Sequence, residues 1–200
     1  MATHCPVATP AQPNVSTNLP LEYQECFALL KQLSFKKGDF ILASGKKANY
    51  YMDCRTTTLS GRGSYLLGKL LYEQIAPLNA DAVGGVVIGA APMVTAVTAH
   101  SAQSGHPLDG FLIRKESKGH GTGKQIEGHI QPWMRVVLVE DVVTTGGSLI
   151  KGIEAIERDF PSVTIAGVIS IVDRNAGGRE ALAQKAIPYQ SLYAIDAFLA

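Results

Sequence analysis

Residues 136–148 read VVLVEDVVTTGGS, and the order of parts in this stretch decides both the fold and the kind of ligand that we expect. Residues 136–139 are apolar and mostly β-branched, which is typical of a parallel strand covered on both faces. Glu140 and Asp141 follow, and carboxylates, which accept hydrogen bonds without donating any, suit a vicinal pair of ribose hydroxyls. Residues 144–148 are small, so backbone amides and hydroxyls can surround a phosphate at the start of the next helix. The stretch therefore predicts a sugar phosphate site.

A buried strand capped by acids and a turn is the plainer interpretation, and the TTGGS loop favours the phosphate site over it. Two other phosphate motifs do not fit. The stretch has no Gly-Lys-Ser/Thr ending, as a Walker loop requires, and no G-x-G-x-x-G, as a dinucleotide fingerprint requires.

The composition indicates a globular protein that needs no disulfides to fold. The chain has 200 residues, 46% of them hydrophobic, and a formal net charge of +1, which gives no reason to expect nucleic acid or an anionic membrane as a partner. Cys5, Cys26 and Cys54 are odd in number and widely spaced, which suits neither a disulfide framework nor a CxxC metal site. We therefore expect reduced thiols in a cytoplasmic protein, with Cys26 and Cys54 in the core.

The first 20 residues are expected to form a disordered tail. They contain four prolines among small and polar residues, and the first basic side chain is Lys31, so the segment does not resemble a targeting sequence. No apolar run approaches the ~20 residues of a membrane span, so none is expected.

From Leu21 onward, helix and strand patterns alternate. The first expected helix covers 21–33, with Asn18 as its cap and Leu21 among its packing residues. Further helices are expected over 61–76, from about 92, over 147–160 and over 176–185. Strands are expected over 35–42, 49–54, 83–88, 109–114, 136–139, 163–172 and in the ending at 188–195. This alternation predicts an α/β fold with a parallel twisted sheet flanked by helices and with ligands at the carboxyl ends of the strands. Residues 21–200 would form one domain, in which about 21–60 make a small hood over a core of about 61–200.

Residues 114–129 read RKESKGHGTGKQIEGH and follow an expected strand. The segment contains four glycines, and five basic side chains fall within the eleven residues 114–124. Such a composition can hardly build a core, so we expect a long mobile loop. Composition alone favours a solvated basic loop with no special role.

Both stretches resemble segments of one enzyme family. VVLVEDVVTTGGS resembles the motif with which type I phosphoribosyltransferases bind 5-phosphoribosyl 1-diphosphate (PRPP), and R-K-x-x-K-x-H-G followed by I-E-G resembles the catalytic loop of the orotate phosphoribosyltransferases. FILASGKKANYYMDCR, over 40–55, and IVDRNAGG, around Arg174, are also similar, so that the resemblance covers about 21–195. The plainer alternatives are that Tyr50 and Tyr51 only belong to a half-exposed strand and that Asp173 and Arg174 are only a surface ion pair; the pattern alone leaves both open.

The chain departs from the family pattern at two places. It reads Ala43 where many members have lysine, and residues 89–93 read GAAPM where many have a Tyr-Lys pair. Lys46, Lys47 or backbone amides of the Gly89 loop are the candidates to replace those contacts.

The resemblance implies transfer of ribose 5-phosphate from PRPP to orotate, giving orotidine 5′-phosphate and pyrophosphate in de novo pyrimidine biosynthesis. It implies Mg²⁺ as cofactor, held mainly by substrate oxygens, and a homodimer whose basic loop reaches into the neighbouring active site, with no nucleic acid and no membrane as partner. The catalytic residues would be Lys118, His120, Glu140 and Asp141. PRPP would be bound by Arg114, Lys115, Lys118, His120, Glu140, Asp141, Val142, Val143, Thr144, Thr145, Gly146, Gly147 and Ser148, and orotate by Thr144, Arg174, Tyr50 and Tyr51.

Two other functions stay open at this point. A phosphoribosyltransferase for another base would keep the phosphate loop but would have less use for Arg174. A regulator that senses PRPP without turning it over would need neither Arg174 nor the basic residues of 114–120. The presence of these residues favours the orotate enzyme.

Overall fold

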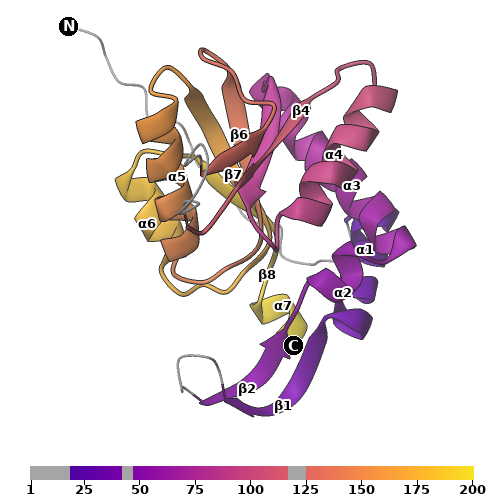
Figure 1. Cartoon of the computed structure of the whole chain (residues 1–200). Coiled ribbons are helices and arrows are strands. Elements are labelled where there is room, and N and C mark those ends of the chain that lie inside the picture. The colour runs from indigo at the N-terminus through magenta and orange to yellow at the C-terminus, as the bar shows by residue number, and fades with distance from the viewer. Residues whose placement is uncertain (1–18, 42–46, 117–124) are drawn as a thin grey trace, which may run out of the picture.

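The computed structural model describes residues 19–41, 47–116 and 125–200. Its main sheet has six strands in the order β5-β4-β3-β6-β7-β8. Five of them are parallel, and the edge strand β5 runs antiparallel to β4. Their bounds are β3 Ala82–Val86, β4 Asp109–Ile113, β5 Ile126–Gly128, β6 Arg135–Val143, β7 Thr164–Asp173 and β8 Tyr189–Ala194. The predicted parallel α/β sheet is confirmed (Figure 1).

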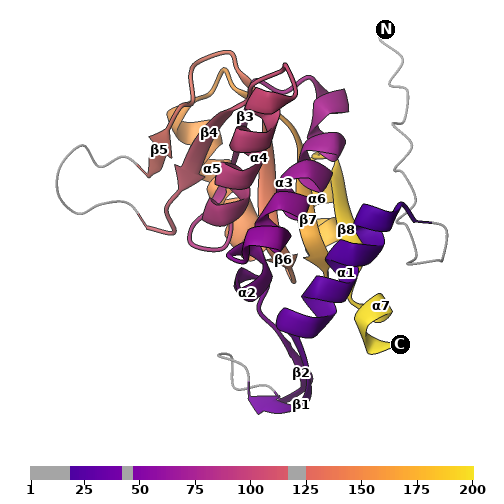
Figure 2. The ribbon, with the colours of Figure 1, turned by 90° about the vertical axis from the view of Figure 1, so that its right-hand side faces the viewer.

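Helices cover both faces of this sheet. Figures 1 and 2 show α1 (Leu21–Leu33), α3 (Gly61–Ile75) and α4 (Ala91–Gln103) on one face, and α5 (Gly147–Asp159) and α6 (Gly178–Gln184) on the other. The apolar run of β6 divides between the two resulting cores. Val137 and Val139 belong to the first core with α1, α3 and α4, and Val136 and Leu138 to the second with α5 and α6. This alternation explains why all four residues are apolar.

Helix α3 has the boundaries that its sequence predicts. Ser60 caps it by accepting a hydrogen bond from the Gly63 amide at 3.2 Å, and its apolar side is buried as expected. Gly68 lies against α4, where a Cβ would come within 2.7 Å of the Ala96 carbonyl oxygen. The glycine therefore lets the two helices approach closely.

A two-stranded hairpin projects from one end of the body (Figures 1 and 2). It consists of β1 (Phe35–Ile41) and β2 (Lys47–Met52), close to the predicted strands. Helix α1 packs in the first core together with α3, so the hairpin is the projecting part of the region expected as a hood. The proposed domain limits remain a prediction.

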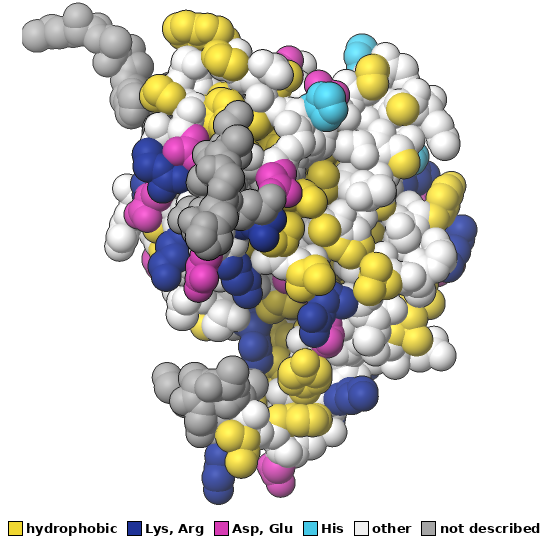
Figure 3. Space-filling view, in the orientation of Figure 1, with side chains coloured by type: hydrophobic (Ala, Val, Ile, Leu, Met, Phe, Trp, Pro, Cys, Tyr) yellow, Lys and Arg dark blue, Asp and Glu magenta, His cyan; other side chains and the backbone are white. Residues whose placement is uncertain are grey.

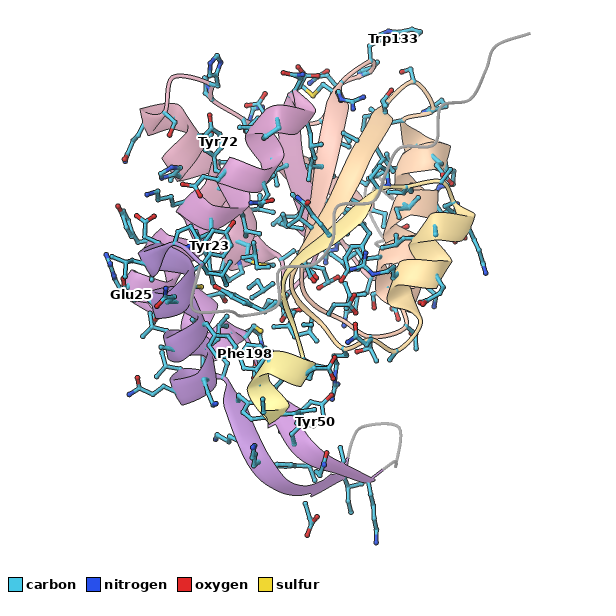
Figure 4. The ribbon with its side chains drawn as sticks, turned by 180° about the vertical axis from the view of Figure 1, so that it is seen from behind. Tyr23, Glu25, Tyr50, Tyr72, Trp133 and Phe198 are labelled. Carbon is cyan, nitrogen blue, oxygen red and sulfur yellow. The ribbon has the colours of Figure 1, made fainter. Side chains whose placement is uncertain are left out.

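Aromatic contacts hold the root of the hairpin. Phe198 of the short helix α7 (Asp196–Leu199) lies 4.5 Å from Phe27, 5.7 Å from Phe35 and 6.2 Å from Tyr193, measured between ring centroids. Figure 4 shows Phe198 where α7 meets the hairpin. The C-terminal end of the chain thus fixes a segment that lies far away in the sequence.

Several sequence-based expectations need correction. Strand β6 does not end at 139 but continues to Val143, because its pairing with β7 continues through Glu140↔Ser170 and Val143↔Asp173. Leu21, expected to pack, is 82% exposed because it occupies the first position of α1. The predictions missed β5, the turn Ala76–Leu78, α2 (Arg55–Thr58) and α7, which are all too short to show a period.

The remaining expectations concern the cysteines, the cap and the membrane. Cys26 and Cys54 are fully buried free thiols, as predicted. Asn18, Cys5 and residues 1–18 of the expected tail lie outside the described residues. The last two residues of the expected tail are described: Leu19 packs against the first core and Pro20 occupies the position before α1, so the disordered tail was predicted too long at this end. In the described part of the chain, no helix has both the length and the apolar character needed to cross a membrane.

Candidate active site

A cleft of about 620 Å³ opens at the carboxyl ends of β3, β6 and β7, beside the hairpin. Figure 3 shows Lys and Arg side chains gathered on this side of the molecule, above the hairpin. The cleft is lined by Tyr51, Met52, Asp53, Arg55, Val86, Val87, Ile88, Gly89, Lys115, Glu140, Asp141, Val142, Val143, Thr144, Thr145, Gly146, Gly147, Ser148, Leu149, Lys151 and Arg174. The structure therefore brings the two acids, the TTGGS loop, Lys115, Tyr51 and Arg174 together, as the sequence predicted.

The TTGGS loop joins β6 to α5 and forms one wall of the cleft. Gly146 has φ of 77°, a left-handed conformation that glycine adopts without strain, and it precedes the first turn of α5. The Thr144 carbonyl accepts from the Gly178 amide at 2.9 Å, which holds the loop against α6. The first amides of an α-helix have no partner within the helix, and the helix dipole favours an anion at that end.

Glu140 and Asp141 lie side by side in the last part of β6. Burial and the neighbouring Asp141 carboxylate together raise the pKa of Glu140 to about 8. Asp141 points toward the loop after β3, where a Cβ on Gly89 would come within 2.9 Å of its Oδ1. Gly89 therefore leaves room for the Asp141 carboxylate at the cleft surface.

Arg174 and Tyr50 meet at the hairpin side of the cleft. The Arg174 Nε donates to Tyr50 Oη at 3.0 Å, and the guanidinium carbon lies 4.8 Å from the centre of the Tyr50 ring. The Arg174 amide also donates to the Val143 carbonyl at 2.9 Å, which ties the loop after β7 to the end of β6. The arginine is thus held in place by two elements.

The alternative interpretations of these residues can now be judged. A surface ion pair of Asp173 and Arg174 is wrong, because Asp173 is only 1% exposed and lies 3.3 Å from the Arg179 guanidinium. Strand β2 is indeed half-exposed, with Tyr50 half-buried and Tyr51 40% exposed. Tyr51 nevertheless lines the cleft, and Tyr50 reaches it through Arg174.

The basic segment starts and ends in ordered structure. The Arg114 amide donates to the Gln125 carbonyl at 2.9 Å, and the Arg114 side chain pairs with Glu127 at 3.0 Å. Lys115 lines the cleft. Lys118 and His120 lie outside the described residues, so their expected roles stay predictions.

Two cations of the cleft were not predicted. They are Arg55, which follows β2, and Lys151 of α5. Lys151 lies three residues after Ser148, so these two residues share one side of α5. The spacing from Ser148 could have indicated that Lys151 belongs to the phosphate site. For Arg55, the one available signal was its place shortly after Tyr50 and Tyr51. Of the suggested replacements for the family lysines, Lys47 is exposed and does not line the cleft, Lys46 lies outside the described residues, and Gly89 does line the cleft.

Comparisons with known proteins agree with this geometry. The Phosphoribosyl transferase domain family matches residues 66–187. The orotate phosphoribosyltransferase of Thermosynechococcus vestitus is 45% identical over 174 residues, which cover 86% of this chain and 90% of the relative. That of Rhodopirellula baltica is 41% identical over 177 residues, covering 86% and 91%.

Solved structures give the same result. Mycobacterium tuberculosis orotate phosphoribosyltransferase in complex with Fe(III) dicitrate has a TM-score of 0.78 and 36% identity, covering 88% of this chain and 98% of that one. The same enzyme in complex with PRPP has a TM-score of 0.74 and 32% identity, covering 90% and 99%. An adenine phosphoribosyltransferase from Leishmania donovani, at a TM-score of 0.63 and 17% identity, shares the fold alone. This chain belongs to the orotate phosphoribosyltransferases.

Proposed function

We propose that this protein carries out in the described cleft the reaction for which its family is named. The phosphoribosyl group of PRPP passes to N1 of orotate, giving orotidine 5′-phosphate and pyrophosphate in pyrimidine biosynthesis. The observation that carries the proposal is one cleft with a phosphate loop, an acid pair and an arginine held over a tyrosine. The phosphate loop suits a phosphate, the acid pair suits the ribose hydroxyls, and the arginine suits an acidic base.

Different residues of the cleft bind the different parts of the two substrates. Amides and hydroxyls of 144–148, at the start of α5, hold the 5′-phosphate. Glu140 and Asp141 accept hydrogen bonds from the ribose hydroxyls, and their negative charge favours the oxocarbenium character of the transition state. Arg174 meets the acidic substituents of orotate, with Thr144, Tyr50 and Tyr51 beside the base.

Negative charge develops on the leaving pyrophosphate, and the basic segment is suited to neutralise it. Lys115 lies in the cleft, and we propose that Arg114, Lys118 and His120 join it when substrates bind. Lys118 is the main electrostatic catalyst in this scheme, and His120 donates a proton to a pyrophosphate oxygen when it is charged. Closure of the segment would also keep water from the activated sugar.

Mg²⁺ is the proposed cofactor. We propose that it is held mainly by pyrophosphate and ribose oxygens, because Mg²⁺ is usually bound by one or two carboxylates together with substrate phosphates. Glu140 and Asp141, which line the cleft, are the carboxylates that would help to hold it. Bound there, the ion would supply Lewis acidity and help to orient the diphosphate.

We also propose a cytoplasmic homodimer with shared active sites. The free thiols of Cys26 and Cys54 agree with a reducing compartment. Leu59, Tyr65 and Ile88 are exposed apolar side chains on α2–α3 and on the loop after β3, and a partner subunit would cover such a surface.

The reaction is tested directly by mixing purified protein with Mg²⁺, PRPP and orotate and following the loss of orotate absorbance. We expect turnover that requires both substrates and that adenine, hypoxanthine and uracil do not support. Turnover with another base in place of orotate would establish the second candidate function. PRPP binding without any turnover would establish a regulator.

Glu140 gives the protein a predictable pH dependence. Because its folded-state pKa is raised to about 8 from an ordinary value of 4.5, the free protein keeps Glu140 protonated below about pH 8. Its contribution to stability therefore falls as pH rises from 4.5 to 8. PRPP needs the ionised carboxylate, so its affinity should rise by up to about tenfold per pH unit between pH 6 and 8 and then level off.

Calorimetry of PRPP binding between pH 6 and 9 measures this effect. The ratio of wild-type to Glu140→Gln affinity should grow with pH, because the titration of PRPP itself is common to both proteins. Glu154→Gln, at an exposed position of α5, serves as the control. A ratio that stays constant over the range would contradict the assigned role of Glu140.

Replacing Arg174 tests base recognition. Arg174→Ala should raise the orotate KM about 30-fold to 1,000-fold, the equivalent of about 2–4 kcal/mol, while the affinity for PRPP changes little. Tyr50→Phe removes the acceptor of the Arg174 Nε but keeps the ring, so it should raise the same KM only severalfold. Arg158→Ala, an exposed arginine on α5, controls for loss of positive charge. Unchanged orotate saturation in Arg174→Ala would show that the base binds elsewhere.

Mixed dimers test whether active sites are shared. Lys118→Ala and Asp141→Asn should each be nearly inactive, and reassortment into heterodimers should recover roughly a quarter of wild-type activity if Lys118 acts in the partner's site. Half of the dimers would be mixed, and in each of these one site would carry neither change. Activity no higher than the mean of the parents, after subunit exchange is verified by mass spectrometry, would exclude a shared site.

A further inference from the structure

Arg55 presents a fixed guanidinium on the hairpin side of the cleft. Its Nε donates to Asp53 Oδ1 and its Nη2 to Asp53 Oδ2, each at 2.8 Å, and Asp53 Oδ1 also accepts from the Arg55 amide at 3.1 Å. These contacts place the side chain at the start of α2, directly after β2. The two parallel side-chain bonds define the plane of the guanidinium, so its orientation is set before any ligand arrives.

Most of the hydrogen-bonding capacity of this group remains for a ligand. A guanidinium has five N–H groups, and Asp53 receives two of them. Within the described ranges, Asp53 is the one acceptor of Arg55 side-chain donors. The Arg55 side chain is 47% exposed and that of Asp53 22%, and an ion pair this exposed adds little to the stability of the fold. A role in binding accounts for the arrangement better than a role in folding.

The position of Arg55 relative to Asp141 indicates which substrate group it meets. Arg55 follows β2 at the start of α2, and its side chain lines the same cleft as Tyr51 and Asp141. Asp141 also lies against Gly89, and Arg55, Gly89 and Asp141 all line the cleft. In PRPP the ribose hydroxyls lie next to C1, which carries the diphosphate, whereas the 5′-phosphate is at the opposite end. A cation that shares the cleft with Asp141 and lies on a different element from the 144–148 loop is therefore assigned to the diphosphate side.

We propose that Arg55 is a further PRPP-binding residue that donates to the diphosphate, and that Asp53 is the positioning residue that orients it. The assignment rests on the proposed function, because it takes Asp141 as the ribose contact. A planar, delocalised guanidinium can donate two parallel hydrogen bonds to phosphate oxygens, whereas the ammonium group of lysine cannot. Arg55 would serve as a permanent contact, available whatever the position of the basic segment 114–129.

Three ligands separate this proposal from its alternatives. Arg55→Gln should weaken PRPP and pyrophosphate binding by about tenfold or more, while ribose 5-phosphate, which has no diphosphate, binds as to the wild type. The orotate KM should change less than twofold. Arg55→Lys should recover only part of the lost affinity, and Asp53→Asn should weaken PRPP binding severalfold although Arg55 is intact.

Arg62→Gln is the matched control. Arg62 makes the same two-bond contact with a carboxylate, to Glu25 at 2.7 and 2.6 Å, but it lies on α3 and does not line the cleft. Figure 4 shows Glu25 on α1. Thermal unfolding of both variants detects any general loss of structure, and we expect Arg62→Gln to bind PRPP normally.

Specific outcomes would overturn the proposal. Equal weakening of ribose 5-phosphate and PRPP would place Arg55 at the 5′-phosphate, and an effect confined to the orotate KM would place it at the base. Unchanged binding of all three ligands would leave Arg55 without a substrate contact. Because binding is measured by calorimetry without turnover, absence of orotate transfer in the wild type would count against the proposed function and not against this assignment.

Discussion

The burial of β6 on both faces is the constraint on which the site depends. Its first apolar residues alternate between two helix-covered cores, and β3 and β7 pair with it on either side. A shift of one residue would exchange the two cores and is excluded by packing. The register with β7 therefore decides where Glu140 and Asp141 lie, and the TTGGS loop follows at a fixed distance. The strand thus positions the residues that we propose to bind the substrate, while its own apolar part is buried in the two cores.

The acid pair has a cost for the free protein. Placing two carboxylates side by side in a partly buried strand disfavours the ionised form of Glu140, as its raised pKa shows. A neutral pair of residues would be more stable there but would have no charge to offer a ribose or an oxocarbenium ion. In the proposed function, ribose hydroxyls that donate to the two carboxylates would offset this repulsion.

Sequence patterns predicted those parts of the protein that depend on local order. The β6 run, the TTGGS loop, α3 and α5 follow from the period of apolar residues and from glycine positions, and Arg174 followed from a resemblance. The end of β6, by contrast, depends on pairing with β7, which no local pattern reveals. Arg55 was not predicted for the same reason, because its place in the cleft follows from how α2 packs against α1 and α3 after the hairpin. Helix α7 is too short to predict, yet it supports that hairpin through Phe198.

The hairpin connects these observations. It supplies Tyr50, which holds Arg174, and it leads into Asp53, which holds Arg55, so two arginines of the cleft are oriented by acceptors on or just after β2. The root of the hairpin packs against Phe198, and this contact helps to hold both acceptors in position. In the proposed function, the aromatic cluster around Phe198 therefore supports substrate recognition by holding the hairpin that carries these acceptors. Base and diphosphate binding should accordingly respond together to any change that loosens the hairpin, whereas the 5′-phosphate loop, built on β6 and α5, should not.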